Sequence, residues 1–295
     1  MSFLARLFKN EPNFDLKIIP ETLEENEKYR LPYFAPGSFI FMQDDDISGN
    51  IEITLKTPGP LNHNGITVSV IGQFRQKVDG TLDQFYIKSS NIATPGSIHN
   101  DTRLPFSVER ILSPIPSYYG SMYDARYIIE VKINSYTFQE PIYFLIPTSP
   151  PEIPEDEEYF KSDVGMQGIL HIEIYFKNHF YDVTDTVYGY IYFHLVKLRI
   201  VDISFQIQRI EAYKNGIVGS KTKFNVATIQ VLDGIPVRGD LIPVRCFMPG
   251  IKAWPYPKNA NANLTVTYLV RLLLVDENGK HYYKELGDQI FRIPQ

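Results

Sequence analysis

Alternation of apolar and polar residues with a period of two recurs along almost the whole chain. A typical run places Ile51, Ile53 and Leu55 at every second position. Successive side chains of a strand point to opposite faces, so this period gathers the apolar residues on one buried face. A helical period of 3.6 residues appears only weakly, around residues 84–92. The sequence therefore predicts an all-β fold built from sandwiches or barrels.

Three landmarks of the first half of the chain recur about 140 residues later, as expected of an internal repeat. The pairs are Gly49 with Gly189, Pro105 with Pro243, and Tyr127 with Tyr268. This near-constant displacement indicates a duplication, and we expect two similar, immunoglobulin-like β-sandwich domains at residues 1–147 and 161–295. A short linker is predicted at residues 148–160, where prolines favour extended backbone and acidic side chains keep it hydrated.

Charge and cysteine content narrow the possible partners and the compartment. The net charge of −5 and the absence of a long Lys/Arg run favour neither nucleic acid nor an anionic membrane as a direct partner. Cys246 is the single cysteine, so no internal disulfide can form, and the reducing cytoplasm is the expected location. The most apolar segment, residues 268–275, contains Arg271 and is far shorter than the roughly 20 residues of a membrane-spanning helix.

The sequence shows no residue pattern of an active site or a cofactor site. On a strand, His171 and Glu173 share one face, which is more typical of a histidine held by a carboxylate than of a metal site. Residues 44–46 are three aspartates without the spaced ligands of a calcium loop. Cys246 is expected to be a small buried residue, and no serine lies in a nucleophile elbow. We therefore predict a protein without enzymatic activity, catalytic residues, metal or cofactor.

Two segments of the C-terminal half have residues suited to protein contacts. Val231 and Leu232 are adjacent apolar residues just before the turn at Asp233 and Gly234, so an alternating strand would expose one of them. An exposed aliphatic residue is either an isolated surface residue or an anchor for a partner. Trp254, the only tryptophan, either closes the end of a sandwich or faces a partner.

Several stretches, in a constant order over nearly the whole chain, resemble the vacuolar protein sorting-associated protein 26 family, the arrestin-like subunits of the retromer coat. They are residues 49–73, 93–97, 125–133, 164–174, 187–200, 231–247 and 266–283. The resemblance implies an arrestin fold, with two β-sandwiches joined end to end by a short linker. This expectation agrees with the duplication read from the sequence.

The resemblance also implies a function and a set of partners. Members of the family are coat subunits and cargo adaptors that retrieve transmembrane proteins from endosomes to the Golgi or the plasma membrane. The implied partners are the large α-solenoid subunit of retromer, through it the small metallophosphoesterase-like subunit, a sorting nexin, and the cytosolic tails of transmembrane cargo. Membrane association is then indirect, on the cytosolic face of endosomes.

Two sets of residues match functional positions of the family. The hairpin that binds the solenoid subunit corresponds to Val231, Leu232, Asp233 and Gly234. The groove that holds cargo tails corresponds to Val164 and Tyr283. A tail laid along a sheet edge would be held by main-chain hydrogen bonds, with its side chains read by an apolar pocket. Tyr283 stands where the family has phenylalanine, which places a hydroxyl in this groove and alters its motif preference.

Related adaptors are the main alternatives to a retromer subunit. They are the arrestin-like subunit of the related retriever complex and another arrestin-type trafficking adaptor; the run PVRGDLIPVRCF at residues 236–247 favours retromer. An α-arrestin that recruits ubiquitin ligases would need a P-P-x-Y motif, which the sequence lacks. A carbohydrate-binding sandwich or a hydrolase would be expected to carry a secretory signal, and residues 1–10 do not show that pattern.

Overall fold

Strands make up most of the chain that the structure describes. The computed structural model describes residues 12–31, 34–147, 159–178, 181–215, 218–256, 263–289 and 291–292. Helical segments in these residues are the short 3-10 turns η2 (Glu24–Tyr29) and η4 (Met248–Gly250). The weakly helical period at residues 84–92 lies within strand β6 (Leu82–Ala93), because pairing with β5 (Ile66–Gln76) overrides it. The predicted all-β fold is confirmed.

The chain divides into two compact units that do not follow its two halves strictly. The first unit comprises the residues up to 28 together with 35–113 and 124–145. The second comprises residues 29–34, 114–123 and those from 146 onwards. The domain bounds read from the sequence stay a prediction, and most of the predicted linker, residues 148–158, lies outside the described residues.

The first unit contains two main sheets and a small third one. One main sheet has the strand order β1-β3-β8 and the other has the order β2-β11-β10-β5-β6, while β4 and β7 form a two-stranded sheet. Besides β5 and β6, the strands are β1 (Phe14–Glu21), β2 (Phe39–Met42), β3 (Ile47–Leu55), β4 (Leu61–His63), β7 (Gly96–Ile98), β8 (Thr102–Val108), β10 (Tyr123–Ile133) and β11 (Tyr136–Leu145). Inward residues such as Ile51, Val68 and Tyr127 are fully buried, as the period of two predicts.

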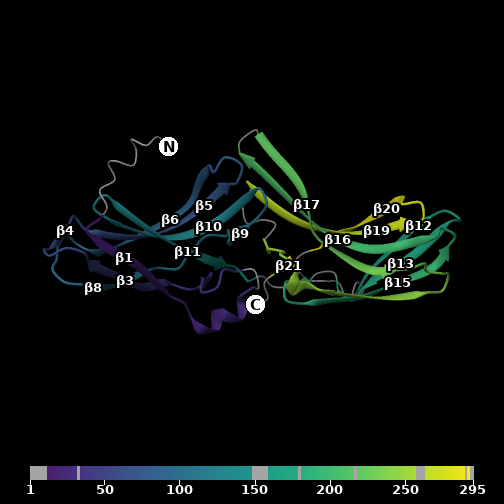
Figure 1. Ribbon diagram of the computed structural model, residues 1–295, viewed down its shortest axis with the longest axis horizontal. Coiled ribbons are helices and arrows are strands. Elements are labelled where there is room, and N and C mark those ends of the chain that lie inside the picture. Colours follow the sequence, from purple (N-terminus) through teal and green to yellow (C-terminus); the bar gives the residue numbers. More distant parts are fainter. Residues whose placement is uncertain are drawn as a thin grey trace. The chain divides into compact units, whose positions relative to one another are not determined.

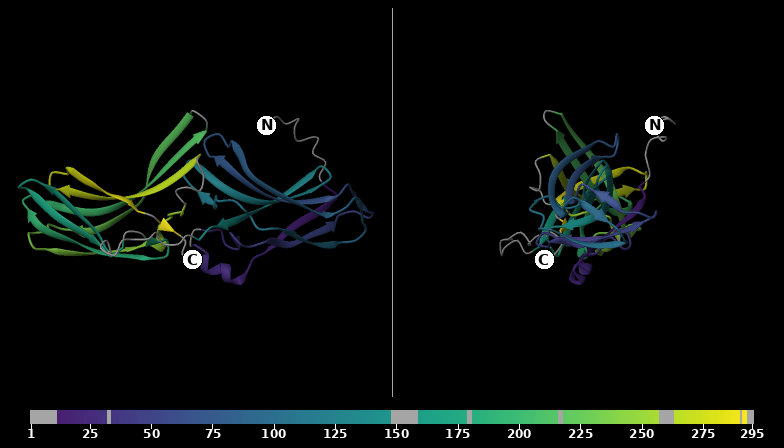
Figure 2. Two further views of the ribbon diagram at one scale, coloured as in Figure 1. Left: turned by 180° about the vertical axis from the view of Figure 1, so that it is seen from behind. Right: turned by 90° about the vertical axis from the view of Figure 1, so that its left-hand side faces the viewer.

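The second unit repeats this plan with two four-stranded sheets, β12-β13-β15-β18 and β17-β16-β19-β20. They lie as separate layers in Figure 1, and Figure 2 shows the same layers from behind. The strands are β9 (Tyr118–Tyr119), β12 (Phe160–Met166), β13 (Leu170–Phe176), β14 (Tyr181–Asp182), β15 (Thr186–Val196), β16 (Ile200–Asn215), β17 (Val218–Asp233), β18 (Leu241–Phe247), β19 (Leu264–Asp276), β20 (His281–Gln289) and β21 (Phe291–Arg292). β14 and β21 form a small parallel pair.

The landmarks of the duplication occupy equivalent places in the two units. Gly49 on β3 lies opposite Phe106, next to the pairing of Asn50 with Pro105, and Gly189 on β15 lies opposite Val244, next to the pairing of Tyr190 with Pro243. The shared position has a steric cause. A Cβ atom on Gly49 would collide with the carbonyl oxygen of Ile19, and one on Gly189 with the carbonyl oxygen of Tyr175. Pro105 lies on β8 and Pro243 on β18, and each of these strands is the last of its sheet. Proline is tolerated on an edge strand because its missing N–H costs no ladder hydrogen bond there.

A buried ion pair joins distant parts of the sequence within the second unit. The Arg209 Nε atom lies 2.8 Å from Glu211 Oε1, and the two side chains are almost fully buried on β16. The backbone amides of Ser121 and Met122 donate to the Glu211 carboxylate over 2.6 and 2.9 Å. The Arg209 guanidinium also donates to Ser121 Oγ over 2.6 Å. Segment 114–123 is thus bound to the second unit by charge-assisted hydrogen bonds.

Aromatic packing closes the same unit around Trp254. The indole is 6% exposed, and its ring lies 5.1 Å from that of Phe34 and 5.0 Å from that of Tyr119, measured between centroids. The Tyr268 hydroxyl donates to the carbonyl oxygen of Trp254 over 2.9 Å. Trp254 is therefore buried within the second unit, which favours a packing role over a surface that faces a partner.

Candidate functional site

The residues matched to solenoid binding lie at the end of β17, where its pairing with β16 is irregular. Ile203 pairs with Leu232 and Ser204 with Gln230, so Val231 is the extra residue of a β-bulge. The side chains of Val231 and Leu232 are both half-buried. The expectation that one of them is exposed was wrong, because the bulge interrupts the strict alternation on which that expectation depends.

The exposed aliphatic residues lie a few positions further on, in the connection from β17 to β18. Ile235 is 47% exposed, Val237 59% and Leu241 56%. We call these three residues, together with Val231 and Leu232, the hairpin surface. The three exposed residues were not identified from the sequence. The signal was present, since they flank turn-forming residues in the segment IPVRGDL at 235–241.

Hydrogen bonds hold this connection in one conformation. Asp240 Oδ2 accepts from the Val237 amide over 2.7 Å, and the Asp240 amide donates back to the Val237 carbonyl over 3.2 Å. Gly239, at a φ of 92°, donates its amide to the Phe193 carbonyl on β15 over 2.8 Å. The amide of Gly234 donates to the Val201 carbonyl over 3.1 Å. The hairpin surface is therefore preorganised, which lowers the entropy cost of binding.

The two residues matched to cargo binding line one groove at the opposite side of the second unit. Val164 on β12 and Tyr283 on β20 both line a cavity of about 410 Å³. The other lining residues are Asp163, Gly165, Met166, Leu170, Leu272, Leu274, His281, Tyr282 and Lys284. β12 and β20 are the end strands of their two sheets. The structure thus brings Val164 and Tyr283 together, and we call this cavity the edge groove.

Tyr283 is an exposed side chain of the edge groove, with 67% of its surface accessible. The guanidinium carbon of Arg271 lies 5.1 Å from the centre of its ring, within the range of a cation–π contact. The Gln206 side-chain oxygen accepts from Arg271 Nε over 3.1 Å and fixes the guanidinium. The groove therefore offers an aromatic face, an apolar floor and two strand edges.

The hairpin surface and the edge groove are joined by one row of residues across the sheet β17-β16-β19-β20. Leu232 pairs with Ile203, Ile203 with Leu274, and Leu274 with Tyr282. Three strand spacings separate the ends of this row, or about 14 Å. Leu274 and Tyr282 line the edge groove, whereas Leu232 belongs to the hairpin surface. The two candidate sites therefore lie at opposite edges of one sheet and at the same height along its strands.

Comparison with known proteins gives this arrangement a family. The model of the family "Vacuolar protein sorting-associated protein 26" matches residues 33–279, well over half of the chain. A "Vacuolar protein sorting-associated protein 26B" of Danio rerio is 30% identical over 260 residues, covering 86% of this chain and 78% of the relative. A "Vacuolar protein sorting-associated protein 26" of Caenorhabditis elegans is 28% identical over 257 residues, covering 86% and 72%. The chain belongs to the vacuolar protein sorting-associated protein 26 family. Its residues 231–234 and Val164 lie inside the match to the family, and Tyr283 lies just beyond its end.

The vacuolar protein sorting-associated protein 26 family member described here shows no metal centre in the part of the chain that the structure covers. No group of three or more His, Cys, Asp or Glu residues there is arranged to hold an ion. His171 Nε2 lies 3.1 Å from Asp163 Oδ1, and His194 Nε2 lies 3.5 Å from Glu173 Oε2. Lys161 bonds to Glu173 over 2.7 Å and lowers the pKa of that carboxyl below its ordinary value. These contacts are those of histidines held by carboxylates.

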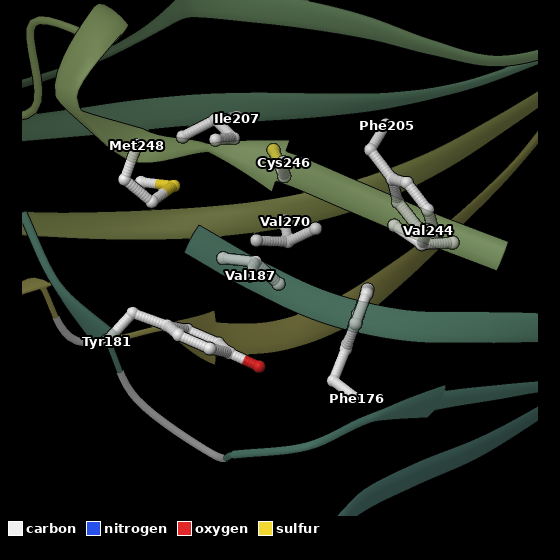
Figure 3. Close-up of a pocket in the computed structure, with 9 residues that line it drawn as sticks. All are labelled: Phe176, Tyr181, Val187, Phe205, Ile207, Val244, Cys246, Met248 and Val270. Atoms are coloured by element: carbon white, nitrogen blue, oxygen red, sulfur yellow. The ribbon is translucent and has the colours of Figure 1, made fainter. Parts of the chain in front are cut away.

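Cys246 lies in the core of the second unit, beside a small apolar cavity of about 30 Å³ (Figure 3). Nine side chains line the cavity: Phe176, Tyr181, Val187, Phe205, Ile207, Val244, Cys246, Met248 and Val270. Burial raises the pKa of the Cys246 thiol to about 11, so the reactive thiolate is scarce at neutral pH.

Among the described residues, no helix has the length and apolar character needed to cross a bilayer.

Proposed function

We propose that this chain is a subunit of the retromer coat that links the coat's large α-solenoid subunit to the cytosolic tails of transmembrane cargo. Membership of the vacuolar protein sorting-associated protein 26 family is the observation that carries the proposal. In this role the chain works on the cytosolic face of endosomes and recruits a sorting nexin as a second tail-binding partner. It acts by presenting surfaces, and it makes or breaks no covalent bond.

The solenoid subunit docks on the hairpin surface. Three aliphatic side chains within seven residues form an exposed apolar surface of the kind that marks protein-binding sites. They are Ile235, Val237 and Leu241. Burial of each such side chain contributes roughly 1.5–3 kcal/mol. Helical repeats expose ridges of side chains against which a preorganised hairpin of this kind packs without rearrangement.

Charge placed at the hairpin surface tests this contact. We expect Leu232→Asp and Val237→Asp each to weaken binding of the solenoid subunit by about 2 kcal/mol or more, because a carboxylate is desolvated at the contact. The measurement is a titration of the purified solenoid subunit by calorimetry. Val237 is the cleaner site, since its exposure leaves little folded structure to disturb.

Ile87→Asp is the matched control for the hairpin surface. Ile87 is an aliphatic residue on β6 of the first unit with 53% exposure, so the same substitution adds the same charge to the other unit. It is expected to bind the solenoid subunit like wild type. Equal binding by wild type and Val237→Asp would remove the hairpin from the interface.

Cargo tails occupy the edge groove as an added strand. In the described residues β12 pairs with β13 alone and β20 with β19 alone, so each presents one free edge of N–H and C=O groups. An extended peptide satisfies such groups by β-augmentation, and the apolar floor of the groove reads its side chains. The hydroxyl of Tyr283 adds a donor that a phenylalanine would lack.

A substitution within the edge groove separates cargo binding from coat assembly. We expect Val164→Asp to weaken binding of a tail peptide at least tenfold while leaving solenoid binding unchanged. The measurement is fluorescence anisotropy of labelled tail peptides with the sorting nexin present. Ile169→Asp, in the adjacent turn and 42% exposed, is the control that lies outside the groove. Simultaneous loss of both activities in Val164→Asp would mean that the variant is misfolded and not cargo-deficient.

The identity of the solenoid partner distinguishes retromer from the related retriever complex. Affinity purification with wild type and Val237→Asp in parallel, followed by identification of the proteins lost with the variant, is the deciding experiment. Loss of the retromer solenoid together with its metallophosphoesterase-like subunit supports the proposal. Loss of a retriever component in its place would contradict it.

A further inference from the structure

A row of tyrosine rings crosses three strands on the outer face of the sheet β12-β13-β15-β18. Tyr159 directly precedes β12, Tyr175 lies on β13 and Tyr190 on β15. The ring centroids are 5.3 Å apart for Tyr159 and Tyr175 and 4.7 Å apart for Tyr175 and Tyr190, and the latter two planes differ by 10°. Pro243 on β18 pairs with Tyr190, so the row reaches the fourth strand.

A groove of about 600 Å³ lies beside this row. Its lining residues are Tyr159, Tyr175, Lys177, Asn178, Tyr188, Gly189 and Tyr190, and we call it the tyrosine groove. Its volume falls in the range of roughly 300–1,000 Å³ that ligand-binding clefts have. Tyr159 is 52% and Tyr188 48% exposed, so their rings are accessible from solvent.

Folding alone does not account for aromatic residues on this face. The core is filled from the other face of the same strands, by residues such as Phe176 and Ile191. The solvent-facing side of an antiparallel sheet is normally polar. Strand propensity explains single tyrosines. Four around one hollow, with Phe247 66% exposed at the end of β18, match the composition of a protein interface.

Positive charge flanks the tyrosine groove. Lys177 lines it, and the guanidinium carbon of Arg245 lies 5.7 Å from the centre of the Tyr188 ring. Within the described chain neither cation forms an ion pair with a carboxylate. Glu173 on the same face is already bonded to Lys161 over 2.7 Å. The groove therefore attracts anionic groups and disfavours a cationic occupant.

The spacing of the rings fits a polyproline II helix. Such a helix has three residues per turn and rises about 9.3 Å per turn, and its carbonyl groups have no internal partners. Tyr159 and Tyr190 are two strands apart, which corresponds to about 9.6 Å. Tyrosine hydroxyls at this spacing can donate to carbonyls three residues apart. Proline rings would then pack against the exposed ring edges.

Nucleic acid fits the same groove less well. Bases bind single tyrosines by stacking on an open ring face. Here Tyr175 and Tyr190 cover one another, and Arg245 covers Tyr188. Ring edges and hydroxyls remain accessible, and these are the groups that an extended peptide uses.

We propose that the tyrosine groove binds a proline-rich, acidic peptide segment of a partner protein, which runs across the strands as a polyproline II helix. Its prolines pack on the tyrosine row, and its carboxylates bind Lys177 and Arg245. The site is separate from the hairpin surface and the edge groove, and it does not depend on the proposed coat function. It provides the chain with a third protein contact.

A repeating probe peptide tests the proposal. We use the full chain and a fluorescein-labelled peptide with three Pro-Pro-Glu repeats, followed by anisotropy. We expect saturable binding that weakens at least tenfold in Tyr190→Thr and in Lys177→Glu, and at least tenfold when the glutamates of the peptide are replaced by lysine. Replacement of its prolines by glycine should have a similar effect, because the polyproline II conformation is lost.

Tyr86→Thr is the matched control, since Tyr86 is a half-buried strand tyrosine on β6 of the first unit and does not line the tyrosine groove. It should bind the probe within twofold of wild type, and the melting temperatures of all variants are compared to identify misfolding. Tyr190→Phe keeps the ring and the fold and should retain part of the affinity. The proposal is overturned if wild type shows no saturable binding, if Tyr190→Thr binds like wild type, or if Tyr86→Thr alone loses the probe. It is also overturned if single-stranded oligothymidylate binds in place of the peptide with the same dependence on Tyr190.

Discussion

At the scale of single residues, Asp276 shows how a turn is fixed by one carboxylate. It ends β19 and is 5% exposed. Its Oδ1 atom accepts from the amides of Lys280 and Asn278, each over 2.9 Å, and its Oδ2 atom accepts from the Tyr282 hydroxyl over 3.1 Å. These bonds, first that from the Lys280 amide, lower the pKa of Asp276 below its ordinary value of 3.8.

The lowered pKa of Asp276 predicts a pH dependence of stability. A carboxyl whose pKa is lower in the folded than in the unfolded state stabilises the fold above the unfolded pKa, and this contribution is lost as pH falls through the folded pKa. We expect Asp276→Asn to be less stable than wild type at pH 7, with a difference that shrinks below about pH 4. Urea unfolding at both pH values measures it. A constant deficit in Asp276→Asn at both pH values would contradict the assignment.

At the scale of strands, the sequence predicts the regular parts of the fold and not the irregular ones. Alternation identified the buried faces where the ladders are uninterrupted, as for Ile51 in the pairing of β1 with β3 and Ile174 in the pairing of β12 with β13. The bulge at Val231 was not predicted, since two adjacent apolar residues do not by themselves show that one of them lacks a partner on the neighbouring strand. The pairing of Arg209 with Glu211 was equally hidden, because two charges at alternate positions read as a solvated face. The match of Val164 and Tyr283 to one groove came from the family resemblance, not from periodicity.

The small cavity within the second sandwich gives a prediction at this scale. Val244 on β18 lines it, so Val244→Ile adds one methyl group to empty apolar space (Figure 3). We expect a gain of about 0.5–1 kcal/mol in the free energy of unfolding. Thermal unfolding of both proteins measures the gain.

Val266→Ile is the matched control for cavity filling. Val266 is 3% exposed on β19 of the same unit and does not line the cavity. An added methyl group there overpacks the core and is expected to be neutral or destabilising. Destabilisation of Val244→Ile to the same extent would show that the cavity does not accept the group.

At the scale of the whole molecule, the two compact units do not contain the same residues as the two halves of the sequence. Residues 114–123 belong to the second unit although they precede the end of the first by sequence. Their hold on that unit rests on Glu211, which accepts from the amides of Ser121 and Met122. Duplication explains the two similar sandwiches, but it does not explain this exchange of segments, which depends on contacts that form only in the folded chain.

Neutralising Glu211 tests how much this exchange stabilises the protein. We expect Glu211→Gln to cost about 3–5 kcal/mol, because it leaves Arg209 buried without its counter-charge. Denaturant unfolding measures the loss. Glu285→Gln removes an equivalent pair with Lys223, 2.9 Å apart but about half exposed, and should cost at most about 1 kcal/mol. Similar costs for the two variants would show that the buried pair has no special weight.

The cross-strand row from Leu232 through Ile203 and Leu274 to Tyr282 fixes a length. If a cargo tail bound the edge groove and the solenoid subunit bound the hairpin surface, this one sheet would hold the two contacts about 14 Å apart. Under the proposed function, each site would remain accessible while the other is occupied, because the two lie at opposite edges of the sheet. The sheet would therefore set the distance between the solenoid subunit and each bound cargo tail.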